Sequence, residues 1–570
     1  MKSVLEAFHE LQKVHEAGVQ FADLHGRLNR HSYAELMQHG RRFAAALLRA
    51  RVERGEPVIL VMTDPENAVI AILGCMIAGC PPAPVYPPMN LQAVPGFLNF
   101  IKHVVERSGA TFVVADPQPF TFLGNVQHES PSVKGVEKFV SLMRSSFLDE
   151  IRVEDREVAF LQFTSGSTSA PKGVVVPHSG LAANLRMIRQ ASRMDNGSCV
   201  VTWLPVYHDM GLIGTVLNAI TLPCKLVVLP PVVFLKKPRL WLELISQFRG
   251  THTAAPNFAY GLCVRRVPNT TGIDLSSMTT FICGAEPVLP RTMEAFVRHY
   301  AGAGLHPGAM VPAYGLAEAT LAVTFSPYLR GMAADEVDLE QLSGSQRAVA
   351  GRQASKSIRI TSCGLPLNGM NVRISSDNGA SLPERCVGEI QISGESVTPG
   401  YAGDDDATRA SRTPDGWLRT GDLGYIANGE LHPCGRIKDI IIIRGKNFHA
   451  HDLESLASEV KGVRTGNVVA FGSRTDAGEA LVLVAESREE GRTAEIAKEV
   501  RAHLAGAIGI GPDEVVIVPP GTLPKTSSGK LKRVETRSLY ETGRLLSSRP
   551  GKIAAWTAAV KSTIGFLRKK

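Results

Sequence analysis

Short apolar runs alternate with a helix-length segment early in the chain. Residues 56–62 and 84–86 read as strands, and residues 66–78 between them have the length and apolar content of a helix. Similar strand-like runs follow at 112–115, 200–203 and 226–229. Because strands that alternate with helices usually pair in parallel, the pattern predicts an α/β fold of layers with mostly parallel strands.

The pattern changes from about residue 358, where short runs such as 372–374 and 388–393 lie among turns. This change predicts a small β-rich subdomain. A chain of 570 residues is also too long for one ordinary core. The predicted division is an N-terminal core at 1–434 with the β-rich subdomain at about 358–434, a smaller α+β domain at 435–545, and a tail at 546–570.

The composition is that of a globular protein, with 44% hydrophobic and 20% charged residues. The nine cysteines form no CxxC pair, which favours reduced, buried thiols over disulfides or a zinc site. The N-terminus resembles an amphipathic helix with acidic residues rather than a signal peptide, and the apolar stretch 68–80 is too short to span a bilayer. We therefore expect a cytoplasmic location.

Positive charge is concentrated near the C-terminal end. Residues 435–570 hold 23 Lys and Arg against 15 Asp and Glu, so the whole net charge of +8 falls there. Such a surface suits an acidic protein, anionic lipid or nucleotide phosphate. Zinc-finger spacing and aromatic RNA-binding patterns are missing from the sequence, so nucleic acid is not an expected partner.

A hydroxyl-rich loop directly follows the apolar run 158–163 and precedes strand-like residues 174–178. Its backbone N–H groups, hydroxyls and Lys172 suit a polyphosphate, whereas a flexible Ser/Gly linker is the alternative. The order of lysine and glycine differs from that of the GxxxxGK[ST] P-loop. The candidate phosphate ligands are Thr164, Ser165, Gly166, Ser167, Thr168 and Lys172.

Two further motifs contain residues suited to a nucleotide. The small residues of the segment 283–287 would let an adenine lie against the backbone, and the segment 313–320 offers an aromatic ring and a hard oxygen ligand. From these we expect Tyr314 to stack on adenine and Glu318 to hold Mg²⁺, although a core tyrosine and a solvated glutamate are the alternative. The candidate nucleotide ligands are Gly284, Ala285, Glu286, Ala313, Tyr314 and Gly315.

Together these motifs resemble, in order, those of the adenylate-forming enzymes, which include acyl-CoA synthetases, luciferases, adenylation domains and fatty acyl-AMP ligases. The resemblance spans roughly residues 55 to 535. It implies a large N-terminal domain joined to a small mobile C-terminal lid, with ATP and Mg²⁺ as cofactors. It also assigns roles to single residues: ribose binding to Asp422, in what reads as a tight turn, ribose or phosphate binding to Arg436, the hinge to Lys438, and catalysis to Lys530.

The hinge motif precedes the apolar run 440–443, which reads as a buried strand. The following segment 448–454 lacks the proline expected near Ala450, a departure that concerns the local loop shape.

The branch of the superfamily is indicated by the segments 203–212 and 255–260, which resemble fatty acyl-AMP ligases. That resemblance places His208 near the substrate carboxylate, although a lone histidine is more often structural. The interval from Tyr314 to Gly364 also looks longer than in acyl-CoA synthetases, as expected for the ligases' insertion that limits lid motion.

The expected reaction is therefore activation of a fatty acid as acyl-AMP, followed by transfer to the phosphopantetheine thiol of a separate acyl carrier protein. The alternatives are a long-chain acyl-CoA synthetase and a catalytically silent acyl-adenylate-binding protein.

The tail offers a separate hypothesis. Its apolar residues at 553, 556, 560, 564 and 567 follow helical spacing with lysines at the ends, which suggests peripheral membrane contact. Packing against the lid is the alternative. The chain length of the acyl group, the identity of the carrier and the oligomeric state stay open.

Overall fold

The structure is a computed structural model. It describes residues 3–88, 94–144, 158–164, 171–351, 356–443, 446–475, 478–508, 511–525 and 530–545. The tail 546–570 and the loop residues Ser165, Gly166, Ser167 and Thr168 lie outside the described residues, so the predictions made for them stay predictions.

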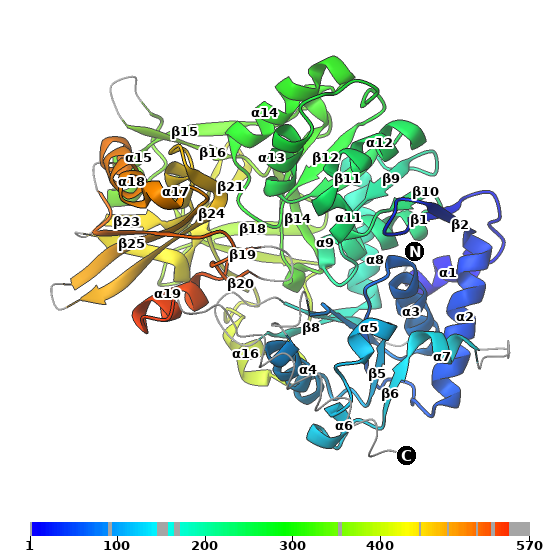
Figure 1. Cartoon of the computed structure of the whole chain (residues 1–570). Coiled ribbons are helices and arrows are strands. Elements are labelled where there is room, and N and C mark those ends of the chain that lie inside the picture. Colours follow the sequence, from blue (N-terminus) through cyan, green and yellow to red (C-terminus); the bar gives the residue numbers. More distant parts are fainter. Residues whose placement is uncertain are drawn as a thin grey trace.

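Two largely parallel sheets form the large N-terminal domain (Figure 1). The first has the order β17 (Leu365–Pro366), β14 (Ala322–Phe325), β13 (Met310–Gly315), β12 (Thr280–Cys283), β11 (His252–Ala255), β9 (Cys199–Thr202), β10 (Lys225–Val228), β1 (Gly18–Ala22) and β2 (Leu28–Ser32). The second has the order β4 (Pro82–Val85), β3 (Val58–Val61), β5 (Phe112–Ala115) and β6 (Gly135–Lys138). In the first sheet β2, β14 and β17 pair antiparallel and the other strands pair in parallel.

Helices cover both faces of each sheet. The layer between the sheets contains α2 (Tyr33–Arg49), α3 (Pro65–Ala78) and α8 (His178–Ser192). The outer layers contain α4 (Val94–Ser108) on one side and α11 (Pro231–Lys236), α12 (Pro238–Phe248), α13 (Asn257–Arg266) and α14 (Pro290–Tyr300) on the other. Shorter or peripheral helices are α1 (Val4–Leu11), α5 (Pro117–Phe120), α6 (Val126–Glu129) and α7 (Phe139–Arg144). The predicted α/β class with mostly parallel strands is confirmed.

Local signals explain why these elements begin and end where they do. In α3, Asp64 caps the N-terminus by accepting the N–H groups of Glu66 and Asn67, and Pro65 occupies the first turn. Gly79 ends the helix in the left-handed conformation, at φ 71°.

Neighbouring residues of one strand, such as Val200 and Val201, point into different cores. Burial on both faces explains the continuous apolar runs in the sequence.

A β-rich region follows the large sheets. Its antiparallel sheet has the order β18 (Met370–Ser375), β19 (Gly388–Gly394), β20 (Leu418–Ala427) and β21 (Glu430–Arg436), with α16 (Asp405–Ala410) between β19 and β20. The interval between Tyr314 and Gly364 contains β15 (Ala334–Asp338), α15 (Leu339–Ser345) and β16 (Ser357–Thr361). We call β15, α15 and β16 the insertion.

The elements from β22 onward form a smaller C-terminal domain beside this region (Figure 1). They are β22 (Ile440–Ile443), β23 (Lys446–His449), α17 (Ala450–Ala457), β24 (Val463–Thr475), β25 (Gly478–Ser487), α18 (Thr493–Ile508), β26 (Glu514–Val518) and α19 (Arg533–Glu541). Strand β22 is buried on one face only, because Ile442 is 52% exposed while Ile441 and Ile443 are buried. The predicted strand is therefore present, but the prediction that it is buried was wrong for Ile442.

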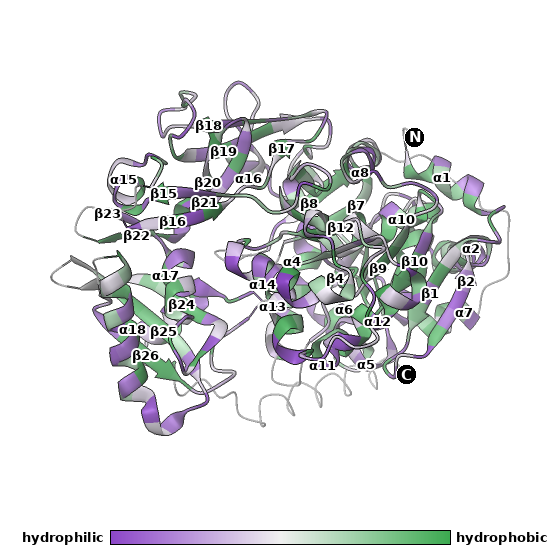
Figure 2. Cartoon of the chain, turned by 90° about the horizontal axis from the view of Figure 1, so that it is seen from above, coloured by the Kyte–Doolittle hydropathy of each residue, from purple (hydrophilic) through white to green (hydrophobic). Residues whose placement is uncertain are grey.

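The hydropathy of the chain follows this layering. Figure 2 shows apolar strands inside the large domain and polar stretches on outward helices such as α18. All nine cysteines are free, and all but the half-buried Cys386 are buried, as predicted. In the described part of the chain, no helix combines the length and apolarity needed to span a membrane.

Candidate active site

The candidate site begins at the carboxyl ends of β12 and β13, which are parallel neighbours. Gly284 follows β12, and a Cβ atom added there would lie 3.0 Å from the carbonyl oxygen of Ala313. At Gly315 a Cβ atom would lie only 2.0 Å from the carbonyl oxygen of Leu321, so a side chain is excluded. The two small-residue motifs therefore meet at one sheet edge, where open α/β sheets usually bind ligands.

The next residues, Ala285 and Glu286, lead away from that edge. Ala285 has a positive φ of 66°, which is uncommon for a residue with a side chain. Glu286 accepts the backbone N–H of Phe258, at the start of α13, at 2.7 Å. Burial raises the pKa of Glu286, although Lys530 and Lys525 oppose the shift. The Glu286 side chain therefore joins two motifs that are separate in the sequence.

Tyr314, Asp422 and Arg436 form a hydrogen-bonded group. The hydroxyl of Tyr314 donates to Oδ2 of Asp422 at 2.8 Å, and Nε of Arg436 donates to Oδ1 at 3.0 Å. Asp422 raises the pKa of Arg436, and burial together with Asp422 raises the pKa of Tyr314. Asp422 lies in strand β20 opposite Arg436 in β21, so the expectation of a tight turn was wrong. The glycine before it, Gly421, has φ 70° and an irregular pairing follows, which explains the turn-like sequence.

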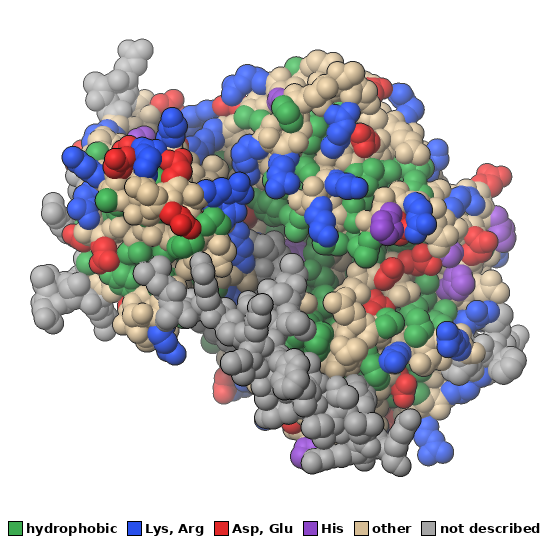
Figure 3. All heavy atoms as spheres, in the orientation of Figure 1, with side chains coloured by type: hydrophobic (Ala, Val, Ile, Leu, Met, Phe, Trp, Pro, Cys, Tyr) green, Lys and Arg blue, Asp and Glu red, His purple; other side chains and the backbone are tan. Residues whose placement is uncertain are grey.

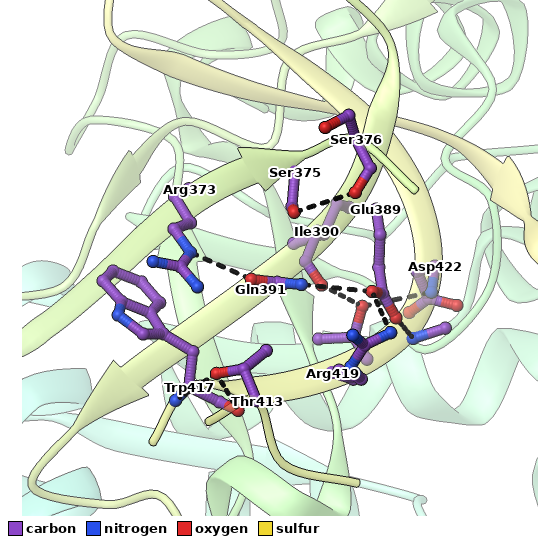
Figure 4. A network of polar contacts seen from close by, with 12 residues as sticks. Arg373, Ser375, Ser376, Glu389, Ile390, Gln391, Thr413, Trp417, Arg419 and Asp422 are labelled. Carbon is purple, nitrogen blue, oxygen red and sulfur yellow. Dashed lines mark hydrogen bonds and ion pairs between the residues drawn. The ribbon is translucent and has the colours of Figure 1, made fainter. Parts of the chain in front are cut away.

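A polar network supports Asp422 from its own strand β20 and from the neighbouring strand β19 (Figure 4). The hydroxyl of Thr420 accepts the N–H of Asp422 at 3.1 Å and donates to the carbonyl of Ile390 at 2.7 Å. Glu389 accepts the N–H of Gly421 at 3.3 Å and the side-chain amide of Gln391 at 3.2 Å. These bonds hold the backbone at Gly421 and Asp422, while Tyr314 and Arg436 hold the Asp422 carboxylate itself.

Glu318 and Lys172 meet at a third residue, Tyr401. The Tyr401 hydroxyl donates to Oε1 of Glu318 at 2.8 Å, and Nζ of Lys172 lies 4.4 Å from the centroid of the tyrosine ring. Glu318 lies in the short turn after β13, and Thr320 in that turn has φ 69°. The hydroxyl of Thr320 donates to the carbonyl of Ser396 at 2.8 Å, which secures the turn. One aromatic residue thus joins the candidate metal ligand to the candidate phosphate ligand.

Lys172 and Thr164 occupy the two ends of the hydroxyl-rich loop. They close the hairpin of β7 (Val158–Phe163) and β8 (Gly173–Pro177), since the N–H of Thr164 donates to the carbonyl of Lys172 at 3.0 Å. The N–H of Lys172 in turn donates to the Thr164 hydroxyl at 3.3 Å. The two described ends of the loop are therefore joined by a hairpin, and phosphate binding by the loop stays a prediction.

His208 and its neighbour Asp209 lie at the start of α9 (Asp209–Gly211), which continues as the π-helix η2 (Leu212–Leu217) and α10 (Asn218–Ile220). Nδ1 of His208 is 2.7 Å from Oδ1 of Asp209. Burial opposes ionisation of Asp209, but His208 and Lys530 outweigh it, so the pKa of Asp209 is lowered. Trp203, from the same motif, stacks on Phe234 with ring centroids 3.9 Å apart. This motif thus places a charged pair close to aromatic side chains of the buried core.

Lys530 reaches the same region from the C-terminal domain. Burial and the positive charge of Arg436 lower its pKa, while the carboxylates of Asp209, Glu286 and Asp422 oppose that shift. Lysine and carboxylates from separate motifs are therefore close enough to influence one another. Figure 3 shows the hollow between the two domains, with Lys and Arg side chains along its rim. Lys438, the predicted hinge, lies in the short turn Ile437–Asp439 that connects β21 to β22.

A model of the AMP-binding enzyme family matches residues 10–402 of the chain. The chain belongs to this family. Among its relatives are the medium-chain-fatty-acid–[acyl-carrier-protein] ligase JamA of Moorena producens, 32% identical over 94% of this chain and 93% of that protein, and the long-chain-fatty-acid–AMP ligase FadD32 of Mycolicibacterium smegmatis, 29% identical over 90% of this chain and 89% of that protein.

Solved structures of AMP-binding enzymes share the fold. A chain from a study of fatty acyl-adenylate ligases from E. coli and L. pneumophila has a TM-score of 0.89 and 30% identity, and it covers 95% of this chain and 98% of its own length. The predicted resemblance to fatty acyl-AMP ligases is confirmed, as are an AMP-forming ligase and the pairing of a large N-terminal with a small C-terminal domain.

Two residues of this AMP-binding enzyme's candidate site were not predicted from the sequence. Tyr401 lies in no recognised motif and is 83 positions from its partner Glu318. Asp209 stands beside a predicted site residue, and the adjacent His–Asp pair was the signal that could have identified it. Tyr401 contacts a residue that is distant in the chain, which spacing rules cannot reveal, whereas the contact of Asp209 with His208 is local.

Proposed function

We propose that this protein activates a fatty acid with ATP as acyl-AMP and then transfers the acyl group to the phosphopantetheine thiol of a separate acyl carrier protein. The observation that carries the proposal is the position of Lys530. A lysine of the C-terminal domain lies close enough to Asp209, Asp422 and Arg436 of the large domain for their charges to shift its pKa. Such an arrangement brings a cation to a nucleotide site at the domain boundary.

In the first step, an oxygen of the fatty acid carboxylate attacks the α-phosphorus of ATP. The bond from that phosphorus to the bridging oxygen breaks, and pyrophosphate leaves. Lys530 would stabilise the negative charge that collects on the α-phosphate and carboxylate, and no covalent bond to the protein is required. Lys172 and Thr164 would hold the leaving phosphates, and His208 would lie near the carboxylate.

In this proposal, the nucleoside of ATP binds along the β12 and β13 edge. The backbone at Gly284, Ala285 and Ala313 would contact adenine, while the Asp422 carboxylate accepts hydrogen bonds from the paired ribose hydroxyls. The Tyr314 hydroxyl already donates to Asp422, so it would fix the side of the carboxylate that faces the ribose. Arg436 would hold the other oxygen of Asp422 or contact the phosphate.

Mg²⁺ fits the chemistry of Glu318. The tyrosine hydroxyl takes one hydrogen-bonding position on Oε1, and a carboxylate has about four such positions in all. Among the described residues no group of three or more His, Cys, Asp or Glu side chains could hold a metal ion. One carboxylate together with phosphate oxygens and water is a usual environment for Mg²⁺. When bound, Mg²⁺ would neutralise charge on the departing pyrophosphate.

In the second step, the thiol sulfur attacks the acyl carbonyl carbon of acyl-AMP. The bond from that carbon to the phosphate oxygen breaks, AMP leaves, and the thiol proton passes to solvent. Lys438 would be the pivot about which the C-terminal domain turns between the two steps.

We also place the enzyme in the cytoplasm. Membrane contact by residues 546–570 stays a prediction. Pelleting of full-length protein and of a variant ending at residue 550 with liposomes would test it.

Preference for a carrier protein over coenzyme A is supported by the insertion. A cavity of about 70 Å³ lies between the insertion and the C-terminal domain, and side chains of both parts line it. Leu339, Leu342 and Ile358 come from the insertion, and Phe448 and Leu453 from the C-terminal domain. Because side chains of both parts meet at this cavity, the insertion would limit how far the C-terminal domain moves, which is the property that disfavours coenzyme A in the ligases this chain resembles.

The test is product analysis with labelled fatty acid, ATP and Mg²⁺, with coenzyme A, with a phosphopantetheinylated carrier, or with neither. We expect acyl-AMP to accumulate without an acceptor and acyl-carrier to form with the carrier. Rapid formation of acyl-CoA would instead identify an acyl-CoA synthetase with a long loop. Binding of acyl-AMP without any synthesis would identify the silent binding protein.

A further inference from the structure

Arg291, on helix α14 of the large domain, contacts the C-terminal domain through several donors. Its Nη2 donates to the carbonyl oxygen of Ser455 at 3.0 Å and to the Ser455 hydroxyl at 3.1 Å. Its Nη1 forms an ion pair with Glu459. Ser455 and Glu459 lie in and just after α17, so one guanidinium connects the two domains at the C-terminal end of that helix.

The contact satisfies a group that α17 cannot satisfy itself. The last carbonyls of a helix have no partner within it, and the helix dipole favours a cation there. The N–H of Ser458 donates to the carbonyls of Glu454 and Leu456, and the N–H of Glu459 donates to that of Leu456, not to Ser455. Arg291 therefore caps the C-terminus of α17 from the other domain.

Both sides of this contact are braced. In the C-terminal domain, Nε2 of His503 in α18 lies 3.1 Å from Oε2 of Glu459, whose other oxygen meets Arg291. In the large domain, Glu294 lies one turn after Arg291 and pairs with Arg359 of the insertion at 2.7 Å. The guanidinium thus joins a helix fixed to the insertion to a helix pair of the C-terminal domain.

We infer that Arg291 is a positioning residue for adenylate formation: it holds the C-terminal domain in the orientation that brings Lys530 to the candidate active site. This inference rests on the proposed function, in which Lys530 serves the first step and the domain turns before the second. Helix α17 follows the hinge residue Lys438 and the short hairpin of β22 and β23 in the chain. Its position relative to the large domain therefore changes when the C-terminal domain turns. The contact favours the first step and must break for the second.

The experiment separates the two half-reactions for Arg291→Met. Pyrophosphate release from fatty acid and ATP should fall about three- to tenfold in kcat, the range expected for losing a partly exposed ion pair and a charge-assisted hydrogen bond. KM for ATP should stay within about twofold, because Arg291 does not touch the nucleotide. Transfer to the carrier from preformed acyl-AMP should be unchanged or faster. Arg298→Met, on the exposed side of the same helix, is the matched control and should resemble the wild type in both steps.

A second background distinguishes positioning from a general effect on the fold. If Arg291 acts through Lys530, then Arg291→Met should change the residual rate of Lys530→Ala by less than about twofold, since coupled residues are not additive. Equal losses in both half-reactions, or additive losses in the Lys530→Ala background, would overturn the inference. Glu459→Gln tests the same contact from the other domain and should lower adenylate formation by a smaller factor, so a poorly folded Arg291 variant does not end the test.

Failure of the proposed function has a different signature. In that case the wild-type protein releases no pyrophosphate with any fatty acid. Failure of the inference alone leaves the wild type active, and Arg291→Met then either resembles it or shows the equal or additive losses described above.

Discussion

Lys172 and Lys530 approach the candidate site from two different domains. Lys172 ends a loop closed by the β7–β8 hairpin, and its ammonium lies over Tyr401 of the same domain. Lys530 precedes α19 in the C-terminal domain, and the charges that act on it belong to the large domain. The fold of one domain fixes the first lysine, whereas the orientation between domains fixes the second.

This difference teaches which changes should affect which step. A substitution at the domain contact should act on Lys530 and leave the phosphate-binding loop intact. A substitution near Tyr401 should alter the binding of phosphate and metal in every orientation of the C-terminal domain. The two lysines can therefore be tested separately.

The largest expected effect is that of Lys530→Ala. Removing the cation that stabilises the transition state should lower adenylate formation about 10²- to 10³-fold, as for other preorganised electrostatic donors. Transfer from preformed acyl-AMP should keep most of its rate, because no bond to the α-phosphorus forms or breaks in that step. Pyrophosphate release and carrier acylation measure the two steps. The control Lys532→Ala removes a nearby lysine that pairs with Glu535, and a similar loss there would contradict the assignment.

Lys172→Met should have the next largest effect. Loss of a point charge on the leaving phosphates should lower kcat/KM for ATP about tenfold, in line with one charge-assisted contact. Steady-state kinetics at saturating fatty acid provide the measurement. If Lys172 binds no phosphate, the variant will have wild-type kcat/KM for ATP.

Tyr401→Phe should produce a smaller change that is confined to Glu318. The substitution keeps the ring beneath Lys172 but removes the hydroxyl that donates to Glu318. We expect the Mg²⁺ concentration for half-maximal activity to rise about two- to fivefold, the cost of one hydrogen bond. Tyr425→Phe is the matched control, because the Tyr425 hydroxyl donates to Asp335 in the insertion at 3.0 Å. An equal shift in both variants would rule out a specific role for Tyr401.

The smallest predicted effect concerns pH. Burial and Arg436 lower the pKa of Lys530, and the active form is the protonated one, so activity is lost as pH rises through the lowered pKa. A profile of kcat/KM for adenylate formation against pH should therefore decline before the pH at which an ordinary lysine loses its proton. Arg keeps its charge there, so Lys530→Arg should remove this decline from whatever activity it retains. A decline of the same shape in Lys530→Arg would assign it to another group.

Local patterns in the sequence were sufficient for much of the fold. The predicted helix at 66–78 corresponds to α3, and the predicted strand at 112–115 coincides with β5. Helix caps and runs of β-branched residues act over a few positions, so the sequence contains their signals directly. The two small-residue motifs likewise identified residues that meet at one sheet edge, and the lysine motif identified Lys530, on which charges of the large domain act.

Only the tertiary structure showed how those residues contact one another. Asp422 lies in strand β20 because its pairing with Arg436 of the neighbouring strand β21 outweighs the turn-like Thr-Gly-Asp sequence. Tyr401 and Arg291 contact partners 83 and 168 positions away, respectively. The position of Lys530 depends on the orientation of a whole domain. The sequence by itself determined which chemical groups this protein has and which local elements carry them. Their contacts were decided by long-range packing, because the energy of a contact depends on distance in space and leaves no periodic pattern along the chain.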